Sequence, residues 1–207
     1  MNLAAALYVY KRFYGPLESV QGTNLEQVFW LIEEEPILDE HKAFLLATFS
    51  IDTLHFFSPT ISPGTPSAFK HLGEGELAQR LGNTDPKDAF KYRPRGYNGV
   101  AGKKYYARIK DKYGVDVLRR PDQLAKDAQL AYRVAVEGVT EGWLTGHKLE
   151  DVLTPENQDF AAARARCSIL GGKSVTFAKC VEIWTKALHA FVTVPQGKKL
   201  PPRNTRR

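Results

Sequence analysis

The first candidate for chemistry in this sequence is a carboxylic acid set among apolar residues. Leu45, Phe49, Asp52 and Phe56 follow one another at spacings of four, three and four, so a helix over residues 39–57 would carry them on one face. Burial in such a face raises the pKa of a carboxyl group and favours its neutral form, which a general acid needs to protonate a leaving oxygen. Asp52 is therefore a candidate general acid. The alternative is an aspartate at the solvated margin of the helix.

Two more carboxylates lie in the segment that follows this helix. Glu74 and Glu76 occur in HLGEGEL, inside a stretch over residues 58–98 that is rich in Gly and Pro and predicts a long irregular loop. A helix-borne acid faced by a loop-borne carboxylate that activates water is the arrangement of inverting glycoside hydrolases. Either glutamate could supply that carboxylate, and two solvated glutamates in a loop would give the same pattern.

Basic and aromatic residues are interleaved in the next segment, KYRPRGYNGVAGKKYYARIKDKYG. Aromatic rings stack on nucleic-acid bases or on sugar rings, and basic groups contact phosphates, so glycan binding and nucleic-acid binding are both open. A solvated helix face with its tyrosines turned inward is the structural alternative. The five histidines are scattered without metal-ligand spacing, and we expect neither a metal nor another cofactor.

The charge of the 207-residue chain is divided between its two parts. Residues 1–90 carry 6 basic and 12 acidic side chains, a net charge of −6, whereas residues 91–207 carry 23 basic and 11 acidic side chains, a net charge of +12. The segment 195–207, PQGKKLPPRNTRR, has five basic residues and no acid, which predicts a disordered basic tail. Such a charge distribution suits an anionic partner, and the tail is a candidate contact for an anionic wall polymer.

Helical periodicity dominates the rest of the chain, and strand signals are nearly absent. The pattern predicts an all-α protein with one domain over residues 1–194. We expect a first helix capped by Thr23 or Asn24 and ending near residue 34. Further helices are predicted over 39–57, 76–81, 103–113, 121–144, 160–170 and 175–192.

The N-terminal segment MNLAAALYVYKRF has the reverse order of a secretory signal, because its apolar run precedes its positive charges. We therefore expect a short amphipathic helix there, and synthesis in the cytoplasm without a signal peptide. No apolar stretch approaches the roughly 20 residues that a membrane-spanning helix needs.

The order of several segments resembles glycoside hydrolase family 19, the type found in chitinases and phage endolysins, over about residues 28–190. The segments are AFLLATFSIDTLHFFSP, KYRPRGYNGVAGKKYY, GVDVLRRPDQLAKDAQLAYRVAVEGVTEGWLTGHKLEDVL and AAARARCSILGGKS, and the stretch 114–149 is the most specific. The resemblance implies a lysozyme-like helical bundle with a glycan cleft. It also implies inverting, metal-independent hydrolysis of β-1,4-linked N-acetylglucosamine polymers, either peptidoglycan or chitin.

The resemblance assigns roles to individual positions. The catalytic acid of the family is the Glu of a His-Glu-Thr sequence, which here reads Ile51-Asp52-Thr53, so the family's acid corresponds to Asp52, and Glu74 or Glu76 would activate water. The cleft motif of the family, Tyr-Gly-Arg-Gly-aromatic-x-Gln-Leu-Thr, has Gly99 in place of Gln and Ala101 in place of Thr. The substrate-binding residues that the resemblance implies are Tyr92, Arg95, Tyr97, Asn98 and Arg164.

Scaffold positions of the family therefore match while polar positions of its cleft are replaced. Loss of such groups typically costs a few kcal/mol of transition-state stabilisation. We accordingly expect a protein that engages amino-sugar glycans with weak, altered or lost hydrolysis. The alternatives are an inactive structural or binding module, for example a component of a phage or bacterial particle, and, ranked last, a nucleic-acid-binding protein. A phage-encoded protein of this kind would act at the cell wall or be carried in a particle.

Overall fold

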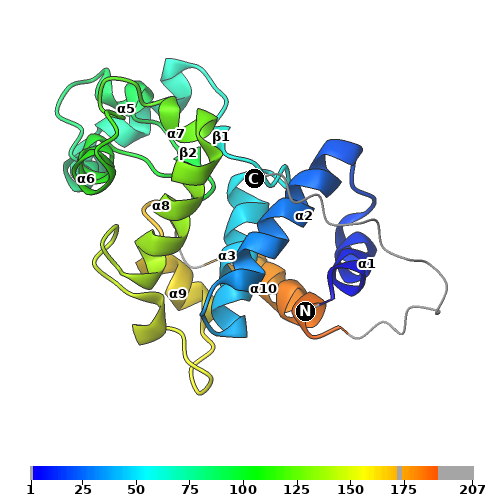
Figure 1. Cartoon of the computed structure of the whole chain (residues 1–207). Helices are drawn as coiled ribbons and strands as arrows, with labels where there is room; N and C mark the ends of the chain where they lie inside the picture. Colours follow the sequence, from blue (N-terminus) through cyan, green and yellow to red (C-terminus); the bar gives the residue numbers. More distant parts are fainter. Residues whose placement is uncertain (1, 172–173, 191–207) are drawn as a thin grey trace.

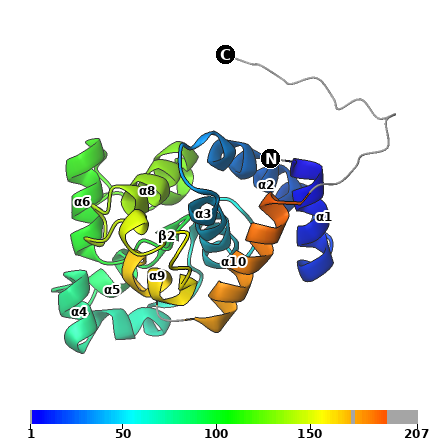
Figure 2. The same ribbon diagram turned by 90° about the horizontal axis from the view of Figure 1, so that it is seen from below.

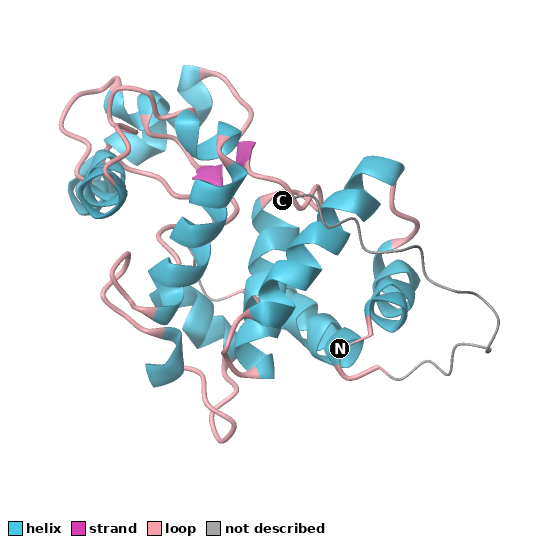
Figure 3. Ribbon diagram, viewed as in Figure 1, coloured by secondary structure: helices cyan, strands magenta, loops and turns pink. Residues whose placement is uncertain are grey.

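The computed structural model describes residues 2–171 and 174–190, and this part of the chain is mainly helical, as predicted (Figure 3). The predicted basic tail, 195–207, lies outside the described residues. Within them, no helix combines the length and the apolar character needed to cross a membrane.

In chain order the elements are α1 (Leu3–Tyr14), α2 (Ser19–Glu34), α3 (Asp39–Asp52), β1 (Thr60–Ile61), the 3₁₀ helix η1 (Pro66–Gly73), α4 (Gly75–Leu81), α5 (Asp88–Lys91), β2 (Arg95–Gly96), α6 (Lys103–Tyr113), α7 (Gln123–Lys126), α8 (Ala128–Thr140), the 3₁₀ helix η2 (Leu149–Asp151), α9 (Phe160–Cys167) and α10 (Val175–Leu188).

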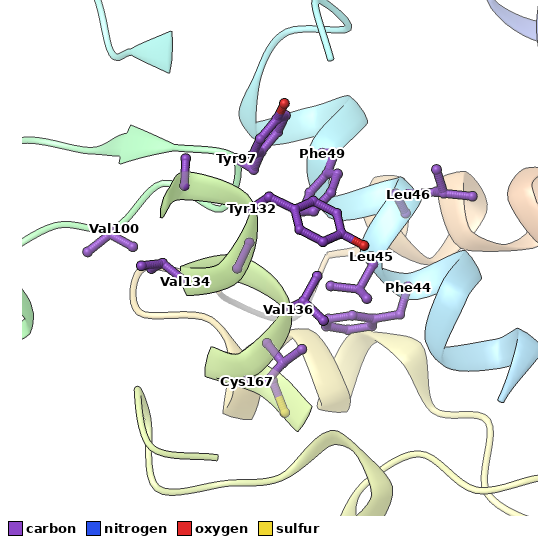
Figure 4. Close-up of a cluster of buried hydrophobic side chains, with 14 of the residues drawn as sticks. Phe44, Leu45, Leu46, Phe49, Tyr97, Val100, Tyr132, Val134, Val136 and Cys167 are labelled. Atoms are coloured by element: carbon purple, nitrogen blue, oxygen red, sulfur yellow. The ribbon is translucent and has the colours of Figure 1, made fainter. Parts of the chain in front are cut away.

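Helix α3 runs through the middle of the molecule and is buried along most of its length (Figures 1 and 2). It packs on α10 and α2, and its apolar side chains meet those of α8 (Figure 4). A helix that is apolar all round belongs in a core, which is why the sequence over 43–49 shows little amphipathicity. The same core contains side chains from every α-helix from α1 to α10.

The buried polar side chains of α3 each find a partner on another element. The indole Nε1 of Trp184 donates to Ser50 Oγ at 2.8 Å, which ties α10 to the centre of α3. The ring Nε2 of His41 lies 2.8 Å from the carbonyl oxygen of Leu153. A buried polar group without a partner costs about 1–3 kcal/mol, so these bonds fix which elements can surround α3.

Helix α3 ends at Asp52, five residues earlier than the sequence predicts, and Phe56 does not extend its face. The chain turns because Leu54, His55 and Phe57 adopt left-handed backbone conformations, with φ of 53°, 63° and 51°. The Thr53 hydroxyl stabilises this turn: it donates to Phe49 O at 2.6 Å and accepts from Phe57 N at 2.9 Å. Apolar residues continue past the helix end, so their periodicity alone does not reveal the turn.

Other predicted boundaries also differ from the structure, and α9 and α10 end at Cys167 and Leu188, three and four residues earlier than predicted. Helix α2 begins at Ser19, where the Glu18 and Gln21 side chains form a capping box, and Asn24 instead donates to the carbonyl oxygen of Phe56 at 2.9 Å. The helix predicted over 121–144 is divided into α7 and α8, because the Asp127 side chain caps the start of α8 by accepting from Leu130 N at 2.9 Å.

The predicted irregular loop contains strands that the sequence did not indicate. Strands β1 and β2 form a two-stranded antiparallel sheet in which Thr60 pairs with Gly96 and Ile61 with Arg95. The backbone N–H of Ser62 continues the pairing by donating to Pro94 O at 2.9 Å. These bonds hold the segment after α3 against residues 94–98, and that contact shapes the site described below.

Helix α6 is flanked by two glycines with positive φ that differ in their surroundings. A Cβ added at Gly102 (φ 93°) would lie 2.7 Å from both Cβ and O of Leu81, whereas a Cβ at Gly114 (φ 71°) would meet nothing within 4 Å. We expect Gly114→Ala to lower the free energy of unfolding by about 1 kcal/mol through backbone strain. Gly102→Ala should cost a further ~1–3 kcal/mol, because Leu81 must move. Urea denaturation of both variants measures these two losses in the free energy of unfolding. Equal losses would contradict the close approach of α4 to α6.

Candidate functional site

A pocket with a volume of about 520 Å³ lies at the C-terminal end of α3. Its walls come from the turn after α3, the β1 segment, residues 94–99 and the end of α9, so it depends on segments far apart in the sequence. Most of its lining is apolar, with a few polar groups among them. The lining residues are Ile51, Asp52, Thr53, Leu54, Phe56, Thr60, Ile61, Ser62, Pro63, Pro94, Asn98, Gly99, Arg164, Ser168 and Leu170.

An ion pair between Asp52 and Arg164 forms the charged part of the pocket. Arg164 Nη2 donates to Asp52 Oδ1 at 2.5 Å, and the two side chains are only 10% (Arg164) and 13% (Asp52) exposed. Arg164 is held from other sides as well, since its Nη1 donates to Thr48 Oγ1 at 3.3 Å and its guanidinium lies 4.9 Å from the centre of the Phe177 ring. The position of the Asp52 carboxyl group is therefore fixed by a rigid partner.

Burial raises the pKa of Asp52 above its ordinary value, and the Arg164 guanidinium opposes part of this effect. The second oxygen, Oδ2, is buried and accepts no hydrogen bond from the described residues. Because Oδ1 accepts from Arg164, the neutral form of Asp52 would carry its proton on Oδ2. This combination of a raised pKa and a free O–H is what a general acid requires.

Residues 98 and 99 lie next to this carboxyl group. A Cβ added at Gly99 would be 3.8 Å from both Cγ and Oδ2 of Asp52, so a side chain at this position would face the acid. The glycine leaves that space open. Asn98 also lines the pocket, and its side-chain Oδ1 is buried without a hydrogen-bond partner among the described residues.

Glu74 and Glu76 lie outside the pocket lining. The Glu74 side chain is 57% exposed and pairs with Lys70 at 3.3 Å, and Glu76 is exposed in the first turn of α4. Among the described residues that line the pocket, Asp52 is the sole carboxylate. The structure therefore does not bring either glutamate to the predicted acid.

Three predicted substrate-binding residues serve the packing of the core. Arg95 is 2% exposed and is bonded to Asp122, to two backbone carbonyl oxygens and to the Tyr106 hydroxyl. Tyr92 is buried and its hydroxyl donates to Leu118 O at 3.2 Å. Tyr97 packs on Phe49 with ring centres 4.7 Å apart, and burial raises the pKa of its hydroxyl to about 12. None of the three lines the pocket.

Of the eight predicted site residues, the structure thus gathers Asp52, Asn98 and Arg164. Sequence reasoning missed the hydroxyl groups of Thr60, Ser62 and Ser168 in the lining. Ser168 follows Arg164 by four residues and could have been found from helical spacing. Thr60 and Ser62 carry no local signal, because the β1–β2 pairing alone brings them to the pocket.

Comparison with solved structures defines the class of fold. A mutant of chitinase C superimposes with a TM-score of 0.54 at 16% sequence identity, over 88% of this chain and 91% of that one. Chitinase C from Streptomyces griseus HUT6037 gives 0.53 at 15% identity, over 90% and 93%. A bacterial family 19 chitinase gives 0.48 at 17% identity, over 91% and 85%. No protein-family model and no curated protein matches the sequence.

The chain therefore has a mainly α, lysozyme-like fold that it shares with chitinase C, as predicted. In this fold the C-terminal end of α3 carries Asp52, and α9 supplies its partner Arg164 from 112 residues further along the chain.

Arg164 should control the titration of Asp52. We expect Arg164→Gln to raise the pKa of Asp52 further, because the cation that favours the carboxylate is removed while burial remains. Arg164→Lys keeps the charge and is the matched control, with a smaller shift. The measurement is an NMR titration of the Asp52 carboxyl carbon in each variant. A wild-type midpoint at the value of an exposed aspartate would contradict the role of burial.

Proposed function

We propose that the pocket binds β-1,4-linked amino-sugar glycans, peptidoglycan or chitin, with Asp52 beside the glycosidic oxygen, and that hydrolysis is weak or lost. The observation that carries this proposal is the Asp52–Arg164 pair. It fixes a desolvated carboxyl group in the wall of a pocket, at the end of the central helix of a fold shared with chitinases.

The lining of the pocket suits an amino sugar. Sugar rings present apolar C–H faces together with hydroxyl and amide donors, and the pocket offers apolar walls with two unpartnered buried acceptors, Asp52 Oδ2 and Asn98 Oδ1. An unmade hydrogen bond at a buried group is costly, so a ligand that brings O–H or N–H donors gains by supplying them. The Phe56 and Leu54 side chains, 46% and 65% exposed, give this wall its apolar surface.

The same geometry favours binding over efficient turnover. An inverting hydrolase needs a second carboxylate roughly 6.5–9.5 Å from the acid to activate water. The described residues of the lining supply Asp52 alone, and Glu74 is engaged with Lys70 on the surface. Asp52 is also one methylene shorter than a glutamate, and catalysis is sensitive to displacements of this size. An inactive glycan-binding or structural module is the limiting case of this proposal.

Binding of short glycans tests the proposal directly. We expect chitin hexasaccharide or a soluble peptidoglycan fragment to bind the full chain in isothermal titration calorimetry. Asn98→Ala should weaken the complex by about 0.5–1.5 kcal/mol, the usual contribution of one hydrogen bond. Asn157→Ala is the matched control, because Asn157 is exposed and lies outside the pocket. Failure of both glycans to bind the wild type would overturn the proposal.

Release of reducing ends from the same glycans tests the role of Asp52 as an acid. We expect low turnover by the wild type, none by Asp52→Asn, and more by Asp52→Glu, which restores the methylene and keeps the carboxyl group. Asp52→Asn should still bind glycan, because its side chain fills the same space. Measurable and equal turnover by the wild type and Asp52→Asn would show that Asp52 is not the acid.

A further inference from the structure

A second charged region lies beside the pocket, around the buried side chain of Arg95. The Arg95 guanidinium donates to Lys91 O at 3.0 Å and to Arg93 O at 2.9 Å, and it pairs with Asp122 at 2.7 Å. These bonds bring the backbone of residues 91–95 next to the segment that enters α7. The bond from the Tyr92 hydroxyl to Leu118 O joins the preceding loop to the same place.

The side chains that extend from this junction are mostly cationic. We refer to Lys91, Arg93, Arg119, Arg120 and Lys126 as the basic cluster. Four of them are exposed, Arg93 is half-buried, and none forms an ion pair with a described residue. Two acids lie nearby: Asp122 pairs with Arg95 and also acts on Arg93 through its charge, and the Asp116 carboxylate accepts the backbone N–H of Arg119. With five cations against these two acids, one of them paired with Arg95, the cluster keeps a net positive charge.

Arg93 shows this excess of charge most clearly. Its Nη1 donates to Phe90 O, but its Nε is buried and has no hydrogen-bond partner among the described residues. Burial and the neighbouring Arg95 lower the pKa of Arg93. An anionic ligand at the solvent-facing part of this guanidinium would offset the repulsion between the two guanidinium groups.

Four of the tyrosines in this region are not available for stacking. Tyr92, Tyr97, Tyr105 and Tyr106 are between 0% and 7% exposed and face the core. Single-stranded nucleic acids owe much of their affinity to bases stacked on exposed aromatic rings, about 1–3 kcal/mol per base. The interleaved tyrosines in the sequence therefore do not form a nucleic-acid platform, and the surface offers charge without stacking.

We propose that the basic cluster binds a flexible polyol-phosphate polymer, a chain of phosphodiesters that carries no bases. The cluster meets the pocket at one point in the chain, because Arg93 directly precedes Pro94 in the pocket lining. A glycan that bears such a polymer could thus contact both sites at once. The proposal does not depend on glycan binding, since poly(glycerol phosphate) alone is the probe.

Binding of the full chain to poly(glycerol phosphate) of defined length tests this assignment. We expect the double variant Arg119→Glu, Arg120→Glu to lose about tenfold or more in affinity and to show a shallower dependence on salt. The matched control is Lys11→Glu, Arg12→Glu, an adjacent exposed pair on α1 at the opposite side of the molecule, with the same change in net charge (Figures 1 and 2). Its loss should stay below about twofold. Equal losses of affinity in the two double variants would show that the polymer binds through the net charge of the protein, and would overturn the proposal.

A second comparison decides the class of polymer. Oligo(dT) with the same number of phosphates should bind no more tightly than poly(glycerol phosphate), because no base can stack. Tighter binding of oligo(dT) that the Arg119→Glu, Arg120→Glu variant abolishes would identify a nucleic-acid site and overturn the assignment. A thermal unfolding measurement checks that the Arg119→Glu, Arg120→Glu variant is folded. If it is not, the neutral variant Arg119→Gln, Arg120→Gln replaces it in the same binding measurements. Binding of chitin hexasaccharide should be unchanged in both the Glu and the Gln double variants. The basic cluster and the pocket are therefore tested separately.

Discussion

The burial of α3 is the constraint on which the rest of the structure depends. A helix surrounded by other elements must have each of its polar side chains paired, and the partners here come from distant parts of the chain. Trp184 of α10 bonds Ser50, the Leu153 carbonyl oxygen bonds His41, and Arg164 of α9 bonds Thr48. Each bond would leave a costly buried group if its element packed elsewhere, so these contacts specify the arrangement of helices as much as the apolar core does.

The candidate site follows from the same constraint. Because α3 is buried up to Ser50, Asp52 is largely desolvated at the point where the chain leaves the core. The turn over residues 53–57 then directs the chain into the β1 segment, which pairs with β2 and brings residues 94–99 to the acid. Arg164 balances the charge of Asp52 and leaves one carboxyl oxygen unpartnered. The pocket thus contains one acid with a raised pKa and an unpartnered oxygen, and the second carboxylate of an inverting hydrolase is not among its described lining residues.

The basic residues of this part of the sequence fall into two groups, one buried and one exposed. Arg95 and the tyrosines around it are buried and hold β2, α6 and α7 together, whereas the basic cluster remains exposed beside the pocket. Arg95 is paired with Asp122, whereas the exposed cations of the basic cluster form no ion pair within the described chain. A glycan-binding pocket and an anion-binding surface would then share the segment 93–98.

The sequence alone determined the helical class of the fold, the limits of α6, and the candidacy of Asp52, because these depend on local periodicity and on residue chemistry. It placed the end of α3 five residues too far, since apolar residues continue through a turn that the Thr53 hydroxyl and left-handed backbone conformations define. Only the tertiary structure decided that Arg164 faces Asp52 while Glu74 and Glu76 do not, and that Arg95, Tyr92 and Tyr97 are core residues. The physical reason is that desolvation and charge pairing are set by segments up to 112 residues apart, which no local pattern records.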